Sequence, residues 1–210
     1  MKNVLLLFTI LLSITVSYAQ TDGKSIIDKF TKQLESYPSI EASFDFTLEN
    51  KEAEISDTNS GKLVIKGEKY RLYMLGMEIY SDGKTSYSFM PNTNEVNITN
   101  VDGEEEGAVD PAKMFRMYKE GMQVNLLSST KKGSITEYKI ELTPSTEDNF
   151  VKLIVYITSD NRLNKAVTYA VDGNIYTINI NQMITDKDFK DTYFKFNESD
   201  HAGVDVIDMR

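Results

Sequence analysis

Apolar and polar positions alternate along most of this chain. From Ser43 to Glu49 every second residue is apolar, as in a strand with one face on a core and one in water. The same alternation returns in short segments separated by Gly, Asn, Pro or Asp, which predicts consecutive antiparallel strands. These segments are centred on residues 63–65, 70–74, 87–89, 96–98, 138–142, 151–158, 163–171 and 176–180. No segment alternates strands with long helices, so we expect a mainly β (α+β) fold built on a large, strongly curved antiparallel sheet.

Two segments have helical periodicity instead. Residues 24–37 place apolar side chains three or four apart, with Asp22 as the N-cap and Pro38 as the end signal. A helix that simply faces the core is the plainer interpretation of this pattern. Residues 111–121 form the second segment, which Asp110 and Pro111 open and Gly121 closes. Its methionines suit a surface that repacks around variable apolar guests, or irregular core filling.

Composition removes several function classes. The 210 residues carry 32 acids and 23 bases, a net charge of −9, which is the wrong sign for binding a nucleic acid backbone. Cysteine and tryptophan are absent and histidine occurs once, so thiol nucleophiles, the usual zinc sites and most Ser-His chemistry are excluded. The acidic run 103–107 lacks the spaced ligands of a calcium loop and is interpreted as a solvated connector. We therefore expect no metal, no cofactor and no enzymatic activity.

The first residues predict export. Lys2 is followed by an apolar run from Val4 to Val16, and small residues at Ser17 and Ala19 form a cleavage pattern before Gln20. The run is shorter than the ~20 residues that a spanning helix needs, which disfavours an uncleaved anchor. We expect residues 1–19 to be a signal peptide and residues 20–210 to be a single domain, and a bacterial periplasm fits an acidic exported chain without disulfides.

Four motifs follow one another in a fixed order. They are residues 60–66 (SGKLVIK), 70–73 (YRLY), 80–85 (YSDGKT) and 87–91 (YSFMP). They make a Gly-containing strand start with a basic strand end, a Ser-Asp-Gly-Lys hairpin and an aromatic strand that ends at proline. In this order they resemble the LolA-type periplasmic carriers of outer-membrane lipoproteins. Residues 138–180 and the tail 194–210 resemble the second half of that family.

The resemblance implies an unclosed β-barrel with a helical lid over an apolar cavity that holds lipoprotein acyl chains in transit. It implies a monomeric carrier between the inner and outer membranes, with lipoproteins, an inner-membrane release complex and possibly an outer-membrane acceptor as partners. One departure stands out. The family carries an Arg-Pro pair after the strand lysine, with the arginine bonded to the lid, whereas Gly67 and Glu68 follow Lys66 here. Arg71 is the nearest guanidinium.

The apolar members of the alternating and helical sets are the candidate ligand-binding residues, although a slip of one residue inverts a strand's faces. The sheet is expected to contribute Phe44, Phe46, Leu63, Ile65, Tyr70, Leu72, Met74, Tyr87 and Phe89 to an acyl-chain cavity. The lid is expected to contribute Ile27, Phe30, Leu34, Met114, Phe115 and Met117.

Two other functions compete with the carrier. A periplasmic module on the same fold that senses lipid or lipoprotein and signals to a protein partner has the same apolar requirements. A carboxylate-pair hydrolase is the enzymatic alternative, but no acidic pair stands in a context that raises a pKa. His201 lies in a polar stretch and fits a solvated tail better than a catalytic base.

Overall fold

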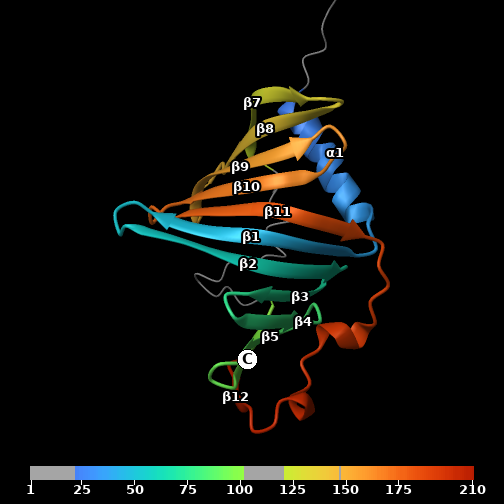
Figure 1. The fold of residues 1–210 in the computed structure, drawn as a ribbon, viewed down its shortest axis with the longest axis vertical. Coiled ribbons are helices and arrows are strands. Elements are labelled where there is room, and N and C mark those ends of the chain that lie inside the picture. The colour runs from blue at the N-terminus through green and yellow to red at the C-terminus, as the bar shows by residue number, and fades with distance from the viewer. Residues whose placement is uncertain (1–21, 102–120, 147) are drawn as a thin grey trace, which may run out of the picture.

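The computed structural model describes residues 22–101, 121–146 and 148–210, in which one α-helix, two short 3-10 helices and one 12-stranded sheet are found (Figure 1). The elements are α1 (Gly23–Ser36), β1 (Ile40–Asn50), β2 (Ile55–Lys66), β3 (Lys69–Met74), β4 (Met77–Ser81), β5 (Thr85–Met90), β6 (Glu95–Asn100), β7 (Gln123–Lys132), β8 (Ile135–Thr143), β9 (Phe150–Thr158), β10 (Leu163–Ala170), β11 (Ile175–Thr185), η1 (Asp191–Phe194), η2 (Glu198–Asp200) and β12 (Asp205–Asp208).

The sheet is one open, almost wholly antiparallel surface. Its strand order is β12-β6-β5-β4-β3-β2-β1-β11-β10-β9-β8-β7, so within the described residues β12 and β7 are the two edges and do not meet. Each neighbouring pair is antiparallel except β12, which lies parallel to β6. The predicted fold class, a mainly β chain with an unclosed sheet, is confirmed.

Helix α1 forms where the periodicity predicts it. The Asp22 side chain accepts a hydrogen bond from the backbone nitrogen of Lys24 at 3.2 Å, which satisfies one of the free donors at the helix start. The helix ends at Ser36, two residues before Pro38. Its buried face carries Ile26, Ile27, Phe30 and Leu34. Residues 111–120 of the predicted second helix lie outside the described residues.

Three strands were not expected from the sequence: β4, β7 and β12. Strand β4 follows β3 through a two-residue turn at Leu75 and Gly76, whose φ angles are 54° and 74°. That turn type favours Asn-Gly, so a leucine at its first position hides the hairpin from sequence inspection. Strand β7 alternates only over its first residues and then becomes uniformly exposed and polar. Strand β12 has four exposed residues.

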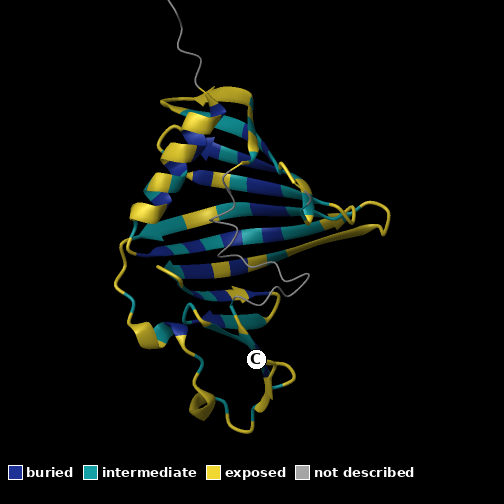
Figure 2. Ribbon diagram, turned by 180° about the vertical axis from the view of Figure 1, so that it is seen from behind, coloured by how far each residue is buried: buried dark blue, intermediate teal, exposed yellow. Residues whose placement is uncertain are grey.

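Buried apolar side chains form two clusters. The helix cluster joins α1 to the start of β1 and to strands β8–β10, and it includes Phe30, Leu34, Ile140, Leu153 and Ile157. The strand cluster draws on β1–β4 and β11, and no helical residue of the described chain belongs to it. Figure 2 shows α1 lying across the strands at one end of the sheet, while the buried positions continue along the strands beyond it. The strand cluster consists of Phe44, Phe46, Leu63, Tyr70, Leu72, Met74 and Ile178, with Leu48, Ile65, Ile79, Tyr176 and Ile180 packed beside them.

Candidate functional site: the inner face of the sheet

Cross-strand register assigns both clusters to the same face of the sheet. Residues paired across neighbouring strands point the same way. The pairs Phe46–Ile178, Ile178–Ala166 and Ala166–Val155 link the strand cluster on β1 to the helix cluster on β9. We call the face that carries α1 and both clusters the inner face, and the opposite one the outer face.

Most of the predicted ligand-binding residues lie together on the inner face. The pair Leu63–Leu72 connects β2 to β3, and Ala42–Leu63 connects β2 to β1. Apart from half-buried Ile65, the predicted ligand-binding residues on this face are almost fully buried. Alternation within the strands and the register between them therefore produce a contiguous apolar surface. Whether this surface binds acyl chains stays a prediction. The predicted members on this face are Phe44, Phe46, Leu63, Ile65, Tyr70, Leu72 and Met74.

The prediction that Tyr87 and Phe89 share this face is wrong. Leu72 pairs with Ile79, whereas Tyr87 pairs with Tyr80 and Phe89 pairs with Glu78. Both aromatic residues of β5 therefore point to the outer face. Sequence alternation marks one apolar face per strand but does not say which side of the sheet that face joins, because the turn between two strands sets their relative register. Ile79 takes the inner position instead.

The C-terminal tail covers the outer face at this point. The Phe196 ring packs on Tyr87, Phe89 and Tyr80, with centroids 6.0, 5.4 and 5.7 Å away. The His201 ring contacts Phe89 at 4.3 Å and Phe196 at 4.5 Å, so it is part of an aromatic cluster rather than of a solvated tail. The aromatic residues of the polar tail were the signal that could have predicted this packing, because large apolar rings favour burial.

Arg71 ties the same tail to the sheet. Its guanidinium lies 4.4 Å from the ring centroid of Tyr80 and 4.9 Å from that of Tyr193 in η1. Arg71 Nη2 donates to Glu78 Oε2 at 2.7 Å, and the Tyr80 hydroxyl donates to the same oxygen at 2.6 Å. Arg71 is thus on the outer face, opposite α1. It does not take the place of an arginine that binds a helical lid on the inner face.

These contacts change the pKa values of Glu78 and Tyr80. Burial alone raises the pKa of the Glu78 carboxyl, but the hydrogen bonds from Tyr80 and Arg71 lower it more, so its pKa lies below the ordinary value. Burial, and then the hydrogen bond to Glu78, raise the pKa of the Tyr80 hydroxyl well above its usual range. Glu78 is therefore ionised and Tyr80 neutral at neutral pH.

Glu78→Gln is expected to reveal a pH-dependent contribution to stability. Because the pKa of Glu78 is lowered on folding, its stabilising effect is present above the unfolded pKa of about 4.3 and is lost as pH falls through the lower folded value. The variant should cost about 2 kcal/mol at pH 7 and much less near pH 3. Urea unfolding at both pH values measures the difference.

Glu52→Gln, in the exposed turn between β1 and β2, is the control for the loss of one negative charge. A Glu78→Gln penalty that stays constant between pH 7 and pH 3 would contradict the expected ionisation of this carboxyl.

The helix residues predicted to form a lid lie elsewhere on the inner face than the strand cluster. Ile27, Phe30 and Leu34 belong to the helix cluster and are grouped with side chains of β8–β10, not with Leu72. Ile180 packs beside both clusters, so the two groups are neighbours on the inner face, and the expectation that they line one cavity stays a prediction. Helical periodicity identifies a buried face but not the strands that face packs against. The other predicted lid residues, Met114, Phe115 and Met117, lie outside the described residues.

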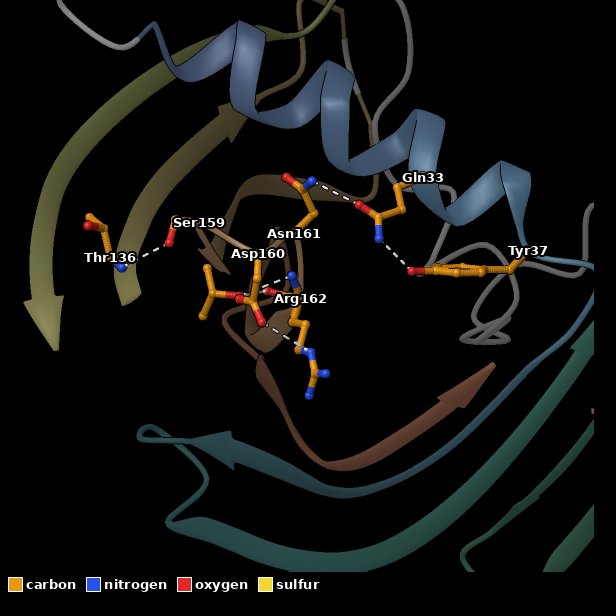
Figure 3. Close-up of polar contacts among 8 residues, drawn as sticks. Gln33, Tyr37, Thr136, Ser159, Asp160, Asn161 and Arg162 are labelled. Atoms are coloured by element: carbon orange, nitrogen blue, oxygen red, sulfur yellow. Dashed lines mark hydrogen bonds and ion pairs between the residues drawn. The ribbon is translucent and has the colours of Figure 1, made fainter. Parts of the chain in front are cut away.

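A polar chain fastens the C-terminal half of α1 to the turn between β9 and β10 (Figure 3). The Asn161 side-chain amide donates to Gln33 Oε1 at 2.8 Å, and the Gln33 amide donates to the Tyr37 hydroxyl at 2.5 Å. Asn161 has a φ of 57°, a left-handed conformation that asparagine tolerates well. The turn thus holds the residue that reaches the helix.

Asn161→Gly is expected to loosen this end of α1. Glycine accepts the same backbone conformation but removes the hydrogen bond to Gln33, so the free energy of unfolding should fall by about 1 kcal/mol. Amide hydrogen exchange in the last turn of α1 should become faster. Glu54→Gly, at an exposed position that is also left-handed with a φ of 54°, is the control and should not destabilise the protein. Equal exchange rates in Asn161→Gly and wild type would exclude a fastening role.

Metal-ligand clusters and membrane-spanning helices are not found in the described part of the chain. Residues 22–101, 121–146 and 148–210 contain no group of three His, Asp or Glu side chains placed to hold a metal ion. Within the same ranges no helix has the length and apolar character to cross a membrane. The apolar inner face remains the candidate site.

The described chain is thus an open, unclosed sheet whose apolar inner face is partly covered by a helix. A family model described as outer membrane lipoprotein carrier protein LolA matches residues 15–173. The chain therefore belongs to this family, as the sequence motifs indicated. No curated protein matches the chain in a sequence search.

Several solved structures are similar to this chain at low sequence identity. An uncharacterized conserved protein from Thermus thermophilus is 11% identical, with 88% of this chain and 98% of that chain covered and a TM-score of 0.55. A LolA superfamily protein from Nitrosomonas europaea is 16% identical, covers 84% of this chain and 99% of its own, and has a TM-score of 0.45. The Mycobacterium tuberculosis lipoprotein LppX is 10% identical, with 79% and 96% covered and a TM-score of 0.48. At these identities the likeness concerns the fold alone.

Proposed function

We propose that this chain is a periplasmic carrier that binds the acyl chains of lipoproteins against the strand cluster and ferries them from the inner to the outer membrane. The observation that carries the proposal is the strand cluster itself. It is a contiguous apolar surface on the inner face of an open sheet, in a chain of the lipoprotein-carrier family. It draws only on strands among the described residues, so α1 does not fill it.

The energetics of acyl-chain transfer support a surface of this kind. Burying an acyl chain is worth about 0.8 kcal/mol for each methylene group, so a chain of ~16 carbons gains ~12 kcal/mol before any costs. Lipoproteins cannot cross an aqueous compartment with such chains exposed. Flat aromatic and unbranched side chains, such as those of Phe46 and Met74, can repack around chains of different shape.

The compartment and partners follow from the same proposal. We expect a signal peptide at residues 1–19, cleavage before Gln20, and a single mature domain at 20–210 in the periplasm. The mature protein is expected to act as a monomer. It would take cargo from an inner-membrane release complex and give it to an outer-membrane acceptor. N-terminal sequencing of the exported protein tests the cleavage position.

A release assay tests the transport function. Inner-membrane vesicles that contain an acylated lipoprotein and its energy-coupled release complex are incubated with the purified mature protein. Lipoprotein should appear in the soluble fraction, bound one to one to the carrier. In cells, depletion should leave several unrelated lipoproteins in the inner membrane.

The same experiments separate the carrier from a lipid-sensing module. A sensor would bind lipid, yet its depletion would change a stress response while lipoproteins stay correctly localised. No release in vitro together with normal localisation in depleted cells would contradict the carrier function.

A further inference from the structure

Gly61 and Phe44 make an unusually close contact at the floor of the strand cluster. The two residues are cross-strand partners on β2 and β1, and both belong to the inner face. A Cβ atom added to Gly61 would lie 2.4 Å from Cζ and 2.6 Å from Cε2 of the Phe44 ring. The far edge of the ring therefore lies directly over the backbone of β2, where only a glycine leaves room for it.

The glycine is required by this space and not by its own backbone. Its φ is not in the left-handed region, so alanine could adopt the same conformation without strain. Phe44 is 2% exposed and has Ile180 as its partner on β11. With β11 on one side and the backbone of β2 beneath it, a displaced ring has to tilt away from the sheet.

We infer that the Gly61–Phe44 pair sets the room that the strand cluster leaves for an acyl chain, and so selects cargo by chain length. This inference rests on the proposed acyl-chain binding. With Gly61 the ring packs against the backbone of β2 and forms part of the strand cluster. Any larger side chain at position 61 raises the ring and shortens the surface along which a chain can lie.

Gly61→Ala tests the assignment with two fatty acids, laurate and palmitate, each displacing an environment-sensitive fatty-acid probe from the purified mature protein. If the ring is raised, one or two methylene groups of palmitate should lose their apolar contacts. The affinity for palmitate should then fall about 4- to 15-fold. Laurate affinity should change much less. Phe44→Leu in the Gly61→Ala background should restore the palmitate-to-laurate ratio, because leucine has no ring to be displaced. Ser56→Ala, on the same strand but exposed and on the outer face, is the control.

The outcomes distinguish this inference from the proposed function. If the wild type binds neither fatty acid, acyl-chain binding fails and the size assignment fails with it. If the wild type binds both, and folded Gly61→Ala keeps the wild-type ratio or Phe44→Leu does not restore it, only the size assignment is wrong. If Gly61→Ala does not fold, the palmitate-to-laurate affinity ratio of the single variant Phe44→Leu tests the inference instead. A raised palmitate-to-laurate ratio then supports the inference, and an unchanged ratio overturns it.

Discussion

Leu72→Glu is expected to abolish acyl-chain binding. Leu72 is 1% exposed at the centre of the strand cluster, and it pairs with Leu63 on one side and Ile79 on the other. A glutamate at this position would place either a charge or a protonated acid without hydrogen-bond partners inside the apolar surface. We expect the affinity for a fatty-acid probe to fall by at least about a hundredfold, measured by probe fluorescence.

Tyr73→Glu is the matched control. It introduces the same charge one residue further along β3, on the outer face, where the side chain is 51% exposed. It should leave probe binding unchanged. Circular dichroism and urea unfolding show whether Leu72→Glu retains the fold. If it does not, Ile79→Glu places the charge at the half-buried inner-face partner of Leu72. Full probe binding by a folded variant of either kind would mean that the inner face is not the acyl-chain site.

Arg71→Met is expected to release the C-terminal tail from the outer face. Methionine keeps an apolar stem but removes the ion pair to Glu78 and the contacts with the rings of Tyr80 and Tyr193. It also leaves the partly buried Glu78 carboxylate without its cation, which is costly. We expect a loss of about 2–3 kcal/mol in the free energy of unfolding, together with faster proteolysis after residue 186.

Arg162→Met is the comparison for this loss. Arg162 also forms an ion pair, with Asp160, but its side chain is 75% exposed, so the variant should cost less than about 1 kcal/mol. Proteolysis of the tail should be unchanged in Arg162→Met. If both variants lose the same small amount of stability and the tail of Arg71→Met stays protected, the cluster around Arg71 does not hold the tail.

Several features of this molecule follow from local sequence alone. The alternation around Phe44, Leu63 and Leu72 predicts strands with one apolar face, because side chains of a strand point to opposite sides in turn. The same holds for Asp22 and Pro38, which mark the ends of α1. The ordered motifs between residues 60 and 91 also indicated the family that the match over residues 15–173 confirms.

What the tertiary structure decided is how these local faces combine. Tyr87 and Phe89 alternate as regularly as Leu72 and Met74, yet the turn at Leu75 and Gly76 and the register of β4 and β5 direct them outward. Arg71 likewise gained a role only when the tail, more than a hundred residues later in sequence, came to lie on it. Pairings of this kind depend on the register between strands and on contacts between distant segments. Hydrophobic periodicity predicts neither the register nor the distant contacts, because it describes one element at a time.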